Sequence, residues 1–282
     1  METRAFETGS TLSLVNDGRL EFFFLGVGSA FAKRHYQTNL LVVKGKDHVL
    51  IDCGTKCPQA LYDVGLPVTA IKNFFITHSH SDHIGGLEEV ALLGRYMAKK
   101  KPVMIIAEAY QHILWDMSLR GGCAHNEEQA GDILKFSDFF EVKRPRHMAD
   151  IPRLTYDTEV GGIGLKMMRT KHIPDSSGTW ESSFWSCGVI IDDRILFTSD
   201  TRYDPELVLS YCKQFPIEVI FHDCQFFTGG VHASLEELAG LPDEIRAKTY
   251  LVHYGDNWEQ FEPRAKELGF AGLAQQMTHY IF

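Results

Sequence analysis

Four side chains that commonly bind metal ions lie within six consecutive residues: His78, His80, Asp82 and His83. The apolar run just before them, residues 74–76, predicts a buried strand. Residues two apart in an extended backbone point to the same side, so His78 and His80 can reach one ion. A mixture of imidazole and carboxylate suits zinc or another divalent first-row metal. The alternative interpretation is a polar loop that binds no metal.

A sharp turn and a helix are expected directly after this segment. Gly85 and Gly86 allow the backbone to bend tightly. Apolar residues at helical spacing then predict a helix over residues 87–97. The order of strand, loop and helix therefore places the four polar side chains at the end of a strand.

The pattern HxHxDH at residues 78–83 resembles the signature of the metallo-β-lactamase superfamily. This resemblance implies three more ligands, each just after a strand: a histidine, an aspartate that bridges two metals, and a last histidine. Residues of these types follow apolar runs further along the chain, namely His172 after 164–168, Asp200 after 195–198, and His253 after 249–252.

The resemblance also implies the role of each ligand. The first metal is bound by His78, His80 and His172, the second by Asp82, His83 and His253, and Asp200 bridges the two. Two such ions share a hydroxide that acts as the nucleophile, because metal ions lower the pKa of bound water to about 7. Zinc is the expected metal, with manganese as the alternative. The other histidines considered are interpreted as surface or structural residues: His35, His48, His112, His125, His147 and His279.

Composition and charge predict an acidic globular protein in the cytoplasm. The 282 residues include 28 Lys+Arg and 37 Asp+Glu, which gives a net charge of −9. We expect neither a signal peptide nor a membrane span, because no segment has the required apolar run. The six cysteines form no CxxC pair, so free thiols in a reducing compartment are expected. Long nucleic acid is an unexpected partner, because the basic clusters at 99–101 and 143–147 are short.

Groups of strands and helices occur in both halves of the chain. With the resemblance, they imply an α/β fold, an αββα sandwich of two mixed sheets flanked by helices, in one domain over residues 1–282. Residues 1–18 could add a strand or an arm. The expected strands are 19–27, 39–44, 49–52, 74–76, 103–106, 164–168, 184–191, 194–198, 217–221 and 249–252. The expected helices are 57–64, 87–97, 108–119, 205–213, 234–238, 243–247 and 258–268.

The segment 120–160 is the least regular part of the sequence, with Gly121, Gly131 and Pro145 among the residues that interrupt it. Its apolar residues could form a lid over the site or a dimer contact. The alternative is an ordinary insertion with a small core of its own.

Three residues, Asp200, Asp223 and His232, narrow the expected chemistry. Asp200 as the bridging residue disfavours a β-lactam substrate, because true β-lactamases most often carry cysteine there. The stretches 25–29, 52–54 and 221–238 resemble ribonuclease Z-like phosphodiesterases. That resemblance implies that Asp223, where the family has glutamate, orients His232, and that His232 assists the leaving oxygen or holds the phosphate. Asp82, His232 and Asp223 are therefore the expected catalytic residues. The alternative is that Asp223 and His232 only fix a loop.

The expected substrate is a small phosphodiester such as a cyclic nucleotide. Residues 232–253 resemble small ribonuclease Z-like proteins that include cyclic-nucleotide phosphodiesterases, among them phage enzymes that degrade bacterial defence signals. Such relatives commonly form homodimers, and a homodimer is expected here. The alternatives are a tRNA 3′-processing-type endoribonuclease, a lactonase or thioester hydrolase, and a non-catalytic binding module with a vestigial site. The ribonuclease alternative requires a protruding Gly- and Lys-rich arm, which we do not find between residues 83 and 200.

Overall fold

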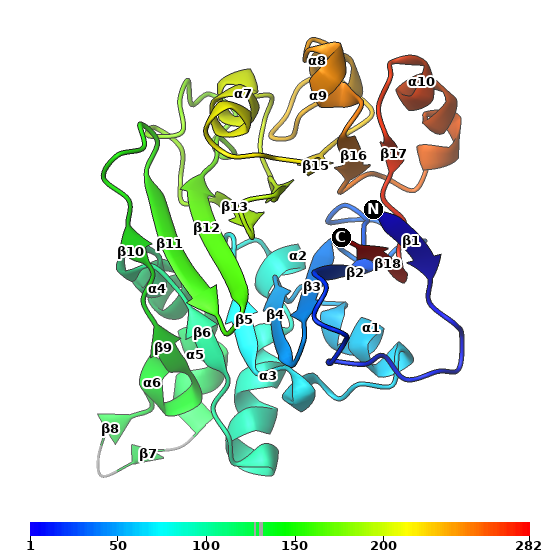
Figure 1. The fold of residues 1–282 in the computed structure, drawn as a ribbon. Coiled ribbons are helices and arrows are strands. Elements are labelled where there is room, and N and C mark those ends of the chain that lie inside the picture. The colour runs from blue at the N-terminus through cyan, green and yellow to red at the C-terminus, as the bar shows by residue number, and fades with distance from the viewer. Residues whose placement is uncertain (127, 130–131) are drawn as a thin grey trace.

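In the computed structural model of the chain, which describes residues 1–126, 128–129 and 132–282, two mixed sheets pack face to face. Figure 1 shows helices on the outer side of each sheet, so that the layers follow the order helix, sheet, sheet, helix. The predicted αββα sandwich is thus confirmed. The two chain ends lie close together in the same view.

The first sheet has the strand order β1-β18-β2-β3-β4-β5-β6-β9. Its strands are β1 (Glu2–Ala5), β2 (Glu21–Gly26), β3 (Asn39–Lys44), β4 (Asp47–Ile51), β5 (Asn73–Phe75), β6 (Val103–Ile105), β9 (Glu141–Lys143) and β18 (Thr278–Ile281). The second sheet runs from β10 to β17 in chain order. Its strands are β10 (Arg146–His147), β11 (Thr155–Val160), β12 (Ile163–Arg169), β13 (Cys187–Ile191), β14 (Ile195–Phe197), β15 (Val219–Asp223), β16 (Thr249–Val252) and β17 (Gly272–Leu273). A separate hairpin joins β7 (Glu128–Gln129) to β8 (Asp132–Ile133).

The helices divide between the two halves of the chain. Those of the first half are α1 (Cys57–Asp63), η1 (Val68–Ala70), α2 (Ser81–Ile84), α3 (Leu87–Leu92), η2 (Leu93–Ala98), α4 (Glu108–Leu114), η3 (Trp115–Leu119), α5 (Arg120–Cys123), η4 (Ala124–Asn126) and α6 (Phe136–Phe139). Those of the second half are α7 (Pro205–Gln214), α8 (Leu235–Leu238), α9 (Asp243–Arg246), η5 (Trp258–Gln260) and α10 (Glu262–Glu267). Here η2 and η3 are π-helical and the other η segments are 3₁₀ turns.

The core follows from the alternation of side chains along each strand. On β2, Phe22 and Phe24 face the second sheet, where their rings lie 5.9 and 4.9 Å from that of Phe221. The intervening Phe23 belongs to a second buried cluster together with Leu61 of α1. Because one buried cluster draws on strands of both sheets, we propose that the chain folds as one domain.

In each sheet, polar residues follow the carboxyl ends of the parallel strands, at one edge of the sheet. In the first sheet β4, β5, β6 and β9 are mutually parallel, and in the second sheet β14, β15, β16 and β17 are. The carboxyl ends of parallel strands meet at the same edge of a sheet. Residues that follow β5, β14 and β16 are therefore brought together across the two sheets.

The terminal strands complete the first sheet. β18 lies between β1 and β2 and is antiparallel to both. The structure thus bears out a strand within residues 1–18. The structure also contains a strand at 278–281, which we did not predict from the sequence. In the described residues no helix is both long and apolar enough to cross a membrane.

The strand expected over 184–191 begins only at Cys187, so this prediction was wrong at its start. The Arg169 guanidinium donates to the backbone carbonyls of Trp180, Ser183, Phe184 and Ser186. The segment before Cys187 is thus held as a loop by these hydrogen bonds. The helix expected over 258–268 is likewise divided into η5 and α10, and Pro263 stands in the first turn of α10.

Apolar residues of the segment 120–160 are largely buried. Phe136, Phe139 and Phe140 have at most 3% of their surface exposed, and Phe136 packs against Trp115 with ring centroids 5.8 Å apart. The segment also supplies edge strands to both sheets. Gly131 and two other residues, at 127 and 130, lie outside the described residues. A role of this segment as a lid or dimer contact stays a prediction.

Candidate metal centre

Each expected ligand follows a strand. His78 comes three residues after β5, and His80, Asp82 and His83 lie at the start of or within α2. In the second sheet the remaining ligands lie beyond three strand ends: His172 after β12, Asp200 after β14, and His253 directly after β16. All seven side chains are buried or largely buried.

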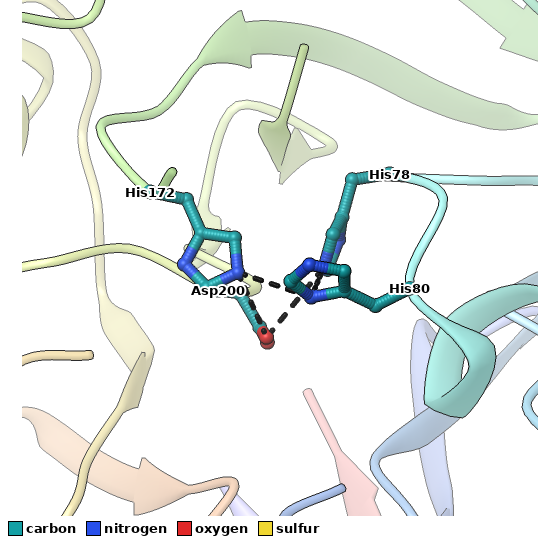
Figure 2. Close-up of side chains that lie close together, drawn as sticks. All are labelled: His78, His80, His172 and Asp200. Carbon is teal, nitrogen blue, oxygen red and sulfur yellow. Dashed lines mark hydrogen bonds and ion pairs between the residues drawn. The ribbon is translucent and has the colours of Figure 1, made fainter. Parts of the chain in front are cut away.

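The first group of ligand atoms comprises three imidazoles and one carboxylate (Figure 2). His80 Nδ1 lies 3.0 Å from His78 Nε2 and 3.3 Å from His172 Nε2. Asp200 Oδ2 lies 3.6 Å from His78 Nε2 and 3.7 Å from His172 Nε2. The four side chains come from three separate segments and converge on one point in Figure 2.

The second group adjoins the first through Asp200. Asp82 Oδ2 lies 3.2 Å from Nε2 of both His83 and His253. Asp200 Oδ1 lies 3.3 Å from His83 Nε2, and Asp200 Oδ2 lies 3.6 Å from His253 Nε2. The structure therefore brings all seven predicted residues together, with Asp200 shared between two groups of four.

The backbone is strained at three of the strand ends that form the site. Asp52, Ser199 and His253 have φ values of +65°, +48° and +63°, in the left-handed region that residues with a side chain seldom adopt. Such conformations cost about 1–3 kcal/mol each and persist where the surroundings enforce them. At His253 the backbone N–H donates to the Val27 carbonyl over 2.8 Å, which holds the strand end in place. The glycine-containing turn at 26–28 thus passes beside the site.

Asp52 supports the site by contacting His83, and we predicted no role for it from the sequence. Its Oδ2 lies 2.7 Å from His83 Nδ1, and its Oδ1 accepts the N–H of Thr77 over 2.8 Å. The carboxylate therefore fixes the ring of His83 and directs Nε2 towards the second group. The only local signal was an aspartate directly after an apolar strand, in the same position as the expected ligands.

We expect Asp52→Asn to weaken metal binding at the second group by about 10–100-fold, because the amide has no charge and can accept at only one of the two atoms that contact His83 and Thr77. The affinity would be measured by competition with a chelator. Asp17→Asn, at an exposed site on another loop, serves as the control. Equal metal affinity in the two variants would contradict the assigned role of Asp52.

Asp223 contacts two histidines at once. Its Oδ2 lies 2.7 Å from His232 Nδ1 and accepts the N–H of Thr201 over 3.0 Å. Its Oδ1 lies 3.4 Å from Nδ1 of the expected ligand His253. The ring of His232 also stacks on that of His253, with centroids 4.6 Å apart. The predicted pairing of Asp223 with His232 is present, and the link to His253 was not expected from the sequence.

Burial and charge act differently on the two groups of histidines. Burial lowers the pKa of His78 and His80 and lowers that of His172 to about 4, so these rings are neutral. Burial also opposes protonation of His83, but the carboxylates of Asp200, Asp82 and Asp52 outweigh it and raise the pKa. Three carboxylates around one histidine indicate a place built for positive charge.

The donor set fits two divalent cations. His83 Nε2 and Asp200 Oδ2 are buried atoms that have no hydrogen-bond partner among the described residues, and such atoms normally cost about 1–3 kcal/mol each. Four ligand atoms placed tetrahedrally at about 2 Å from zinc are roughly 3.3 Å apart. The nitrogen–nitrogen and nitrogen–oxygen distances of the two groups lie close to that value. The unpaired atoms are therefore explained if each group holds one ion.

The histidines outside the two groups agree with their interpretation as surface or structural residues. His48 is buried and its Nε2 accepts the N–H of Lys72. His279 is buried beside Glu21. His112, His125 and His147 are exposed, and His35 is half-buried.

Comparison with known proteins agrees with this geometry. Residues 20–280 match the family described as "Anti-Pycsar protein Apyc1". A relative of that name from Paenibacillus harenae is 38% identical over 85% of this chain and 92% of its own length. Another, from Bacillus phage BSP38, is 37% identical over 88% and 93%. The metallo-β-lactamase fold protein YhfI of Bacillus subtilis has 13% identity and a TM-score of 0.69, over 94% of this chain and all of that one.

The sequence-based predictions of fold and enzyme class are confirmed by these findings. The likeness to YhfI confirms the fold. The family match covers nearly the whole chain and includes every residue of the two ligand groups. The protein is a hydrolase of the metallo-β-lactamase fold, and it belongs to the family of anti-Pycsar Apyc1 proteins.

Proposed function

We propose that the protein hydrolyses a small phosphodiester, such as a cyclic nucleotide, with two divalent cations held by the seven ligands. We assign His78, His80 and His172 to the first ion, Asp82, His83 and His253 to the second, and Asp200 to both, and zinc is the proposed metal. When bound, the two ions supply an activated water and offset the negative charge of the phosphoryl group. Asp82 acts in catalysis by fixing the second ion.

The observation that carries the proposal is the pair formed by Asp223 and His232 beside the ligands. His232 Nδ1 faces Asp223, and among the described residues Nε2 of His232 has no hydrogen-bond partner in the protein. The ring is one-fifth exposed and lies 3.8 Å from Asp200 Oδ2. It is therefore placed to donate a proton to the alkoxide that leaves when a phosphodiester is cleaved. Lactones and thioesters have less need of such a group.

Family membership supports the small substrate. The curated relatives are named anti-Pycsar proteins and occur in bacteria and in Bacillus phages. This agrees with the resemblance of residues 232–253 to small phosphodiesterases rather than to enzymes that process tRNA. Because the chain belongs to this family, we propose an anti-Pycsar role for it as well.

The test is a substrate panel with the zinc-loaded protein. It contains 3′,5′- and 2′,3′-cyclic nucleotides, a chromogenic bis-aryl phosphodiester, a lactone and a tRNA precursor. We expect turnover of cyclic nucleotides that is lost after chelation and restored by zinc or manganese. Turnover of the lactone or the tRNA precursor alone would overturn the proposal, and metal binding without turnover of any substrate would indicate a binding module.

A homodimer is also proposed, on the basis of the sequence resemblance. Light scattering at micromolar concentration measures the mass directly. A mass near 32.0 kDa, that of one chain, would contradict it.

A further inference from the structure

A cavity of about 300 Å³ opens beside the first ligand group. The three histidines of that group, His78, His80 and His172, all line it. Ile113 and Met117, from α4 and η3, line it together with Ile173 and Phe184 from the loop between β12 and β13. This volume lies at the lower end of the range of small-molecule sites, which is about 300–1,000 Å³.

Two of the lining side chains are unusually exposed for their size. Phe184 has 70% and Met117 has 77% of its surface exposed. Single exposed apolar residues are common, but these two border one cavity that also contains expected metal ligands. Among the described residues, Phe184 makes no contact with another aromatic ring. Its ring is therefore available to stack on a ligand.

The loop that carries Phe184, residues 173–186, is held in place before any ligand binds. Arg169 donates to the carbonyl of Phe184 itself, and its guanidinium lies 4.9 Å from the ring centroid of Trp185. Tyr110 stacks on that tryptophan, with centroids 5.6 Å apart and an angle of 6°. Trp185, the residue next to Phe184, is thus held by contacts with both Arg169 and Tyr110.

A second arginine fixes the other end of the loop. Arg202 donates to the carbonyls of Asp175 and Ser177 and to the hydroxyl of Ser177. An ordered wall loses little conformational entropy when a ligand binds. The loop therefore has the properties of a preformed binding surface.

The hydroxyl groups of the cavity are already engaged. Ser79 Oγ bonds Tyr110 Oη over 2.9 Å, and Ser186 Oγ bonds Thr170 Oγ1 over 2.8 Å. The cavity consequently offers apolar surface and an aromatic face, and its ionisable side chains are the three histidines His78, His80 and His172. Such a lining suits a planar ring that is bound by stacking on its faces, with the attached phosphodiester at the metal centre.

We propose that this cavity binds the heteroaromatic ring of the substrate, with Phe184 stacked on the ring and Met117 covering it. The proposal rests on the proposed phosphodiesterase function for the nature of the ring. Stacking of a base on an aromatic side chain corresponds to about tenfold or more in affinity. Phe184 is therefore a specificity-determining residue that favours ring-bearing phosphodiesters over those without a ring.

The test compares Phe184→Ala with Phe184→Trp and with Tyr62→Ala. Tyr62 is an equally exposed aromatic, 74% exposed, on α1 and outside the cavity. Two readouts are taken: KM and kcat for a cyclic nucleotide, and calorimetric binding of adenosine, which has no phosphate and requires no hydrolysis. We expect Phe184→Ala to raise KM and weaken adenosine binding about tenfold with kcat retained. Phe184→Trp should restore both values, and Tyr62→Ala should leave them unchanged.

The two readouts separate failure of the ring site from failure of the proposed function. Unchanged KM and unchanged adenosine binding in Phe184→Ala would overturn the ring site, even with full phosphodiesterase activity. The same result together with a loss of dimer mass would assign Phe184 to a subunit contact instead. Absence of cyclic-nucleotide turnover in the wild type, with adenosine binding still dependent on Phe184, would overturn the phosphodiesterase proposal and retain the cavity as a ring site.

Discussion

Replacing Asp200 by asparagine is expected to lower kcat by at least about 10³-fold and to deplete both metal sites. Asp200 is the one residue that belongs to both ligand groups, through Oδ1 towards His83 and Oδ2 towards His78, His172 and His253. Asparagine keeps the size of the side chain but removes its negative charge. Its amide nitrogen also turns hydrogen atoms towards a place that requires lone pairs.

The measurements are kcat and the metal content per chain after dialysis. Asp116→Asn is a matched control, because Asp116 is half-exposed and its ion pair with Arg120 lies outside both ligand groups. The proposed ligand His78 is a member of the first group alone, so His78→Ala should deplete one ion before the other. An Asp200→Asn protein that retains two ions per chain and near-normal turnover would exclude the bridging role.

The part of the site that is local in sequence could be predicted from the sequence. His78, His80, Asp82 and His83 lie on one strand end and one turn of α2, so their spacing alone brings them together. His172, Asp200 and His253 each required knowledge of what to look for, because a single polar residue after a strand is as often a turn or capping residue as a ligand. Their convergence depends on the packing of one sheet on the other, which no local pattern records.

Asp52 shows why the supporting residues were harder to find. It is 31 positions away from His83 in the sequence, and the two meet only because β4 and β5 are parallel neighbours. Trp185 and Phe184 illustrate the opposite error. Their apolar character predicted a strand, but they lie in a loop, where the Arg169 guanidinium donates to the carbonyls of Ser183 and Phe184. Long-range polar contacts of this kind override the local pattern.

Replacing His232 by alanine is expected to lower kcat for a cyclic nucleotide by about 10²–10⁴-fold while both ions are retained. His232 Nδ1 faces Asp223, and the side chain of His232 is more exposed than that of Asp200. Its loss therefore removes a proton donor without removing any of the seven proposed metal ligands. Asp223→Asn differs, because Asp223 also lies 3.4 Å from His253. That variant should lose turnover and, in addition, bind the second ion about 10–100-fold more weakly.

The leaving group provides a sharper test of the same residue. An alkoxide needs a proton as it departs, whereas a nitrophenolate is stable without one, so proton donation matters less for an aryl phosphodiester. His232→Ala should therefore lose much more activity on a cyclic nucleotide than on the chromogenic bis-aryl phosphodiester, and its metal content should equal that of the wild type. An equal loss on both substrates with both ions bound would mean that His232 holds the phosphate rather than protonates the leaving oxygen. An unchanged rate on both would leave Asp223 and His232 as a pair that only fixes the loop before α8.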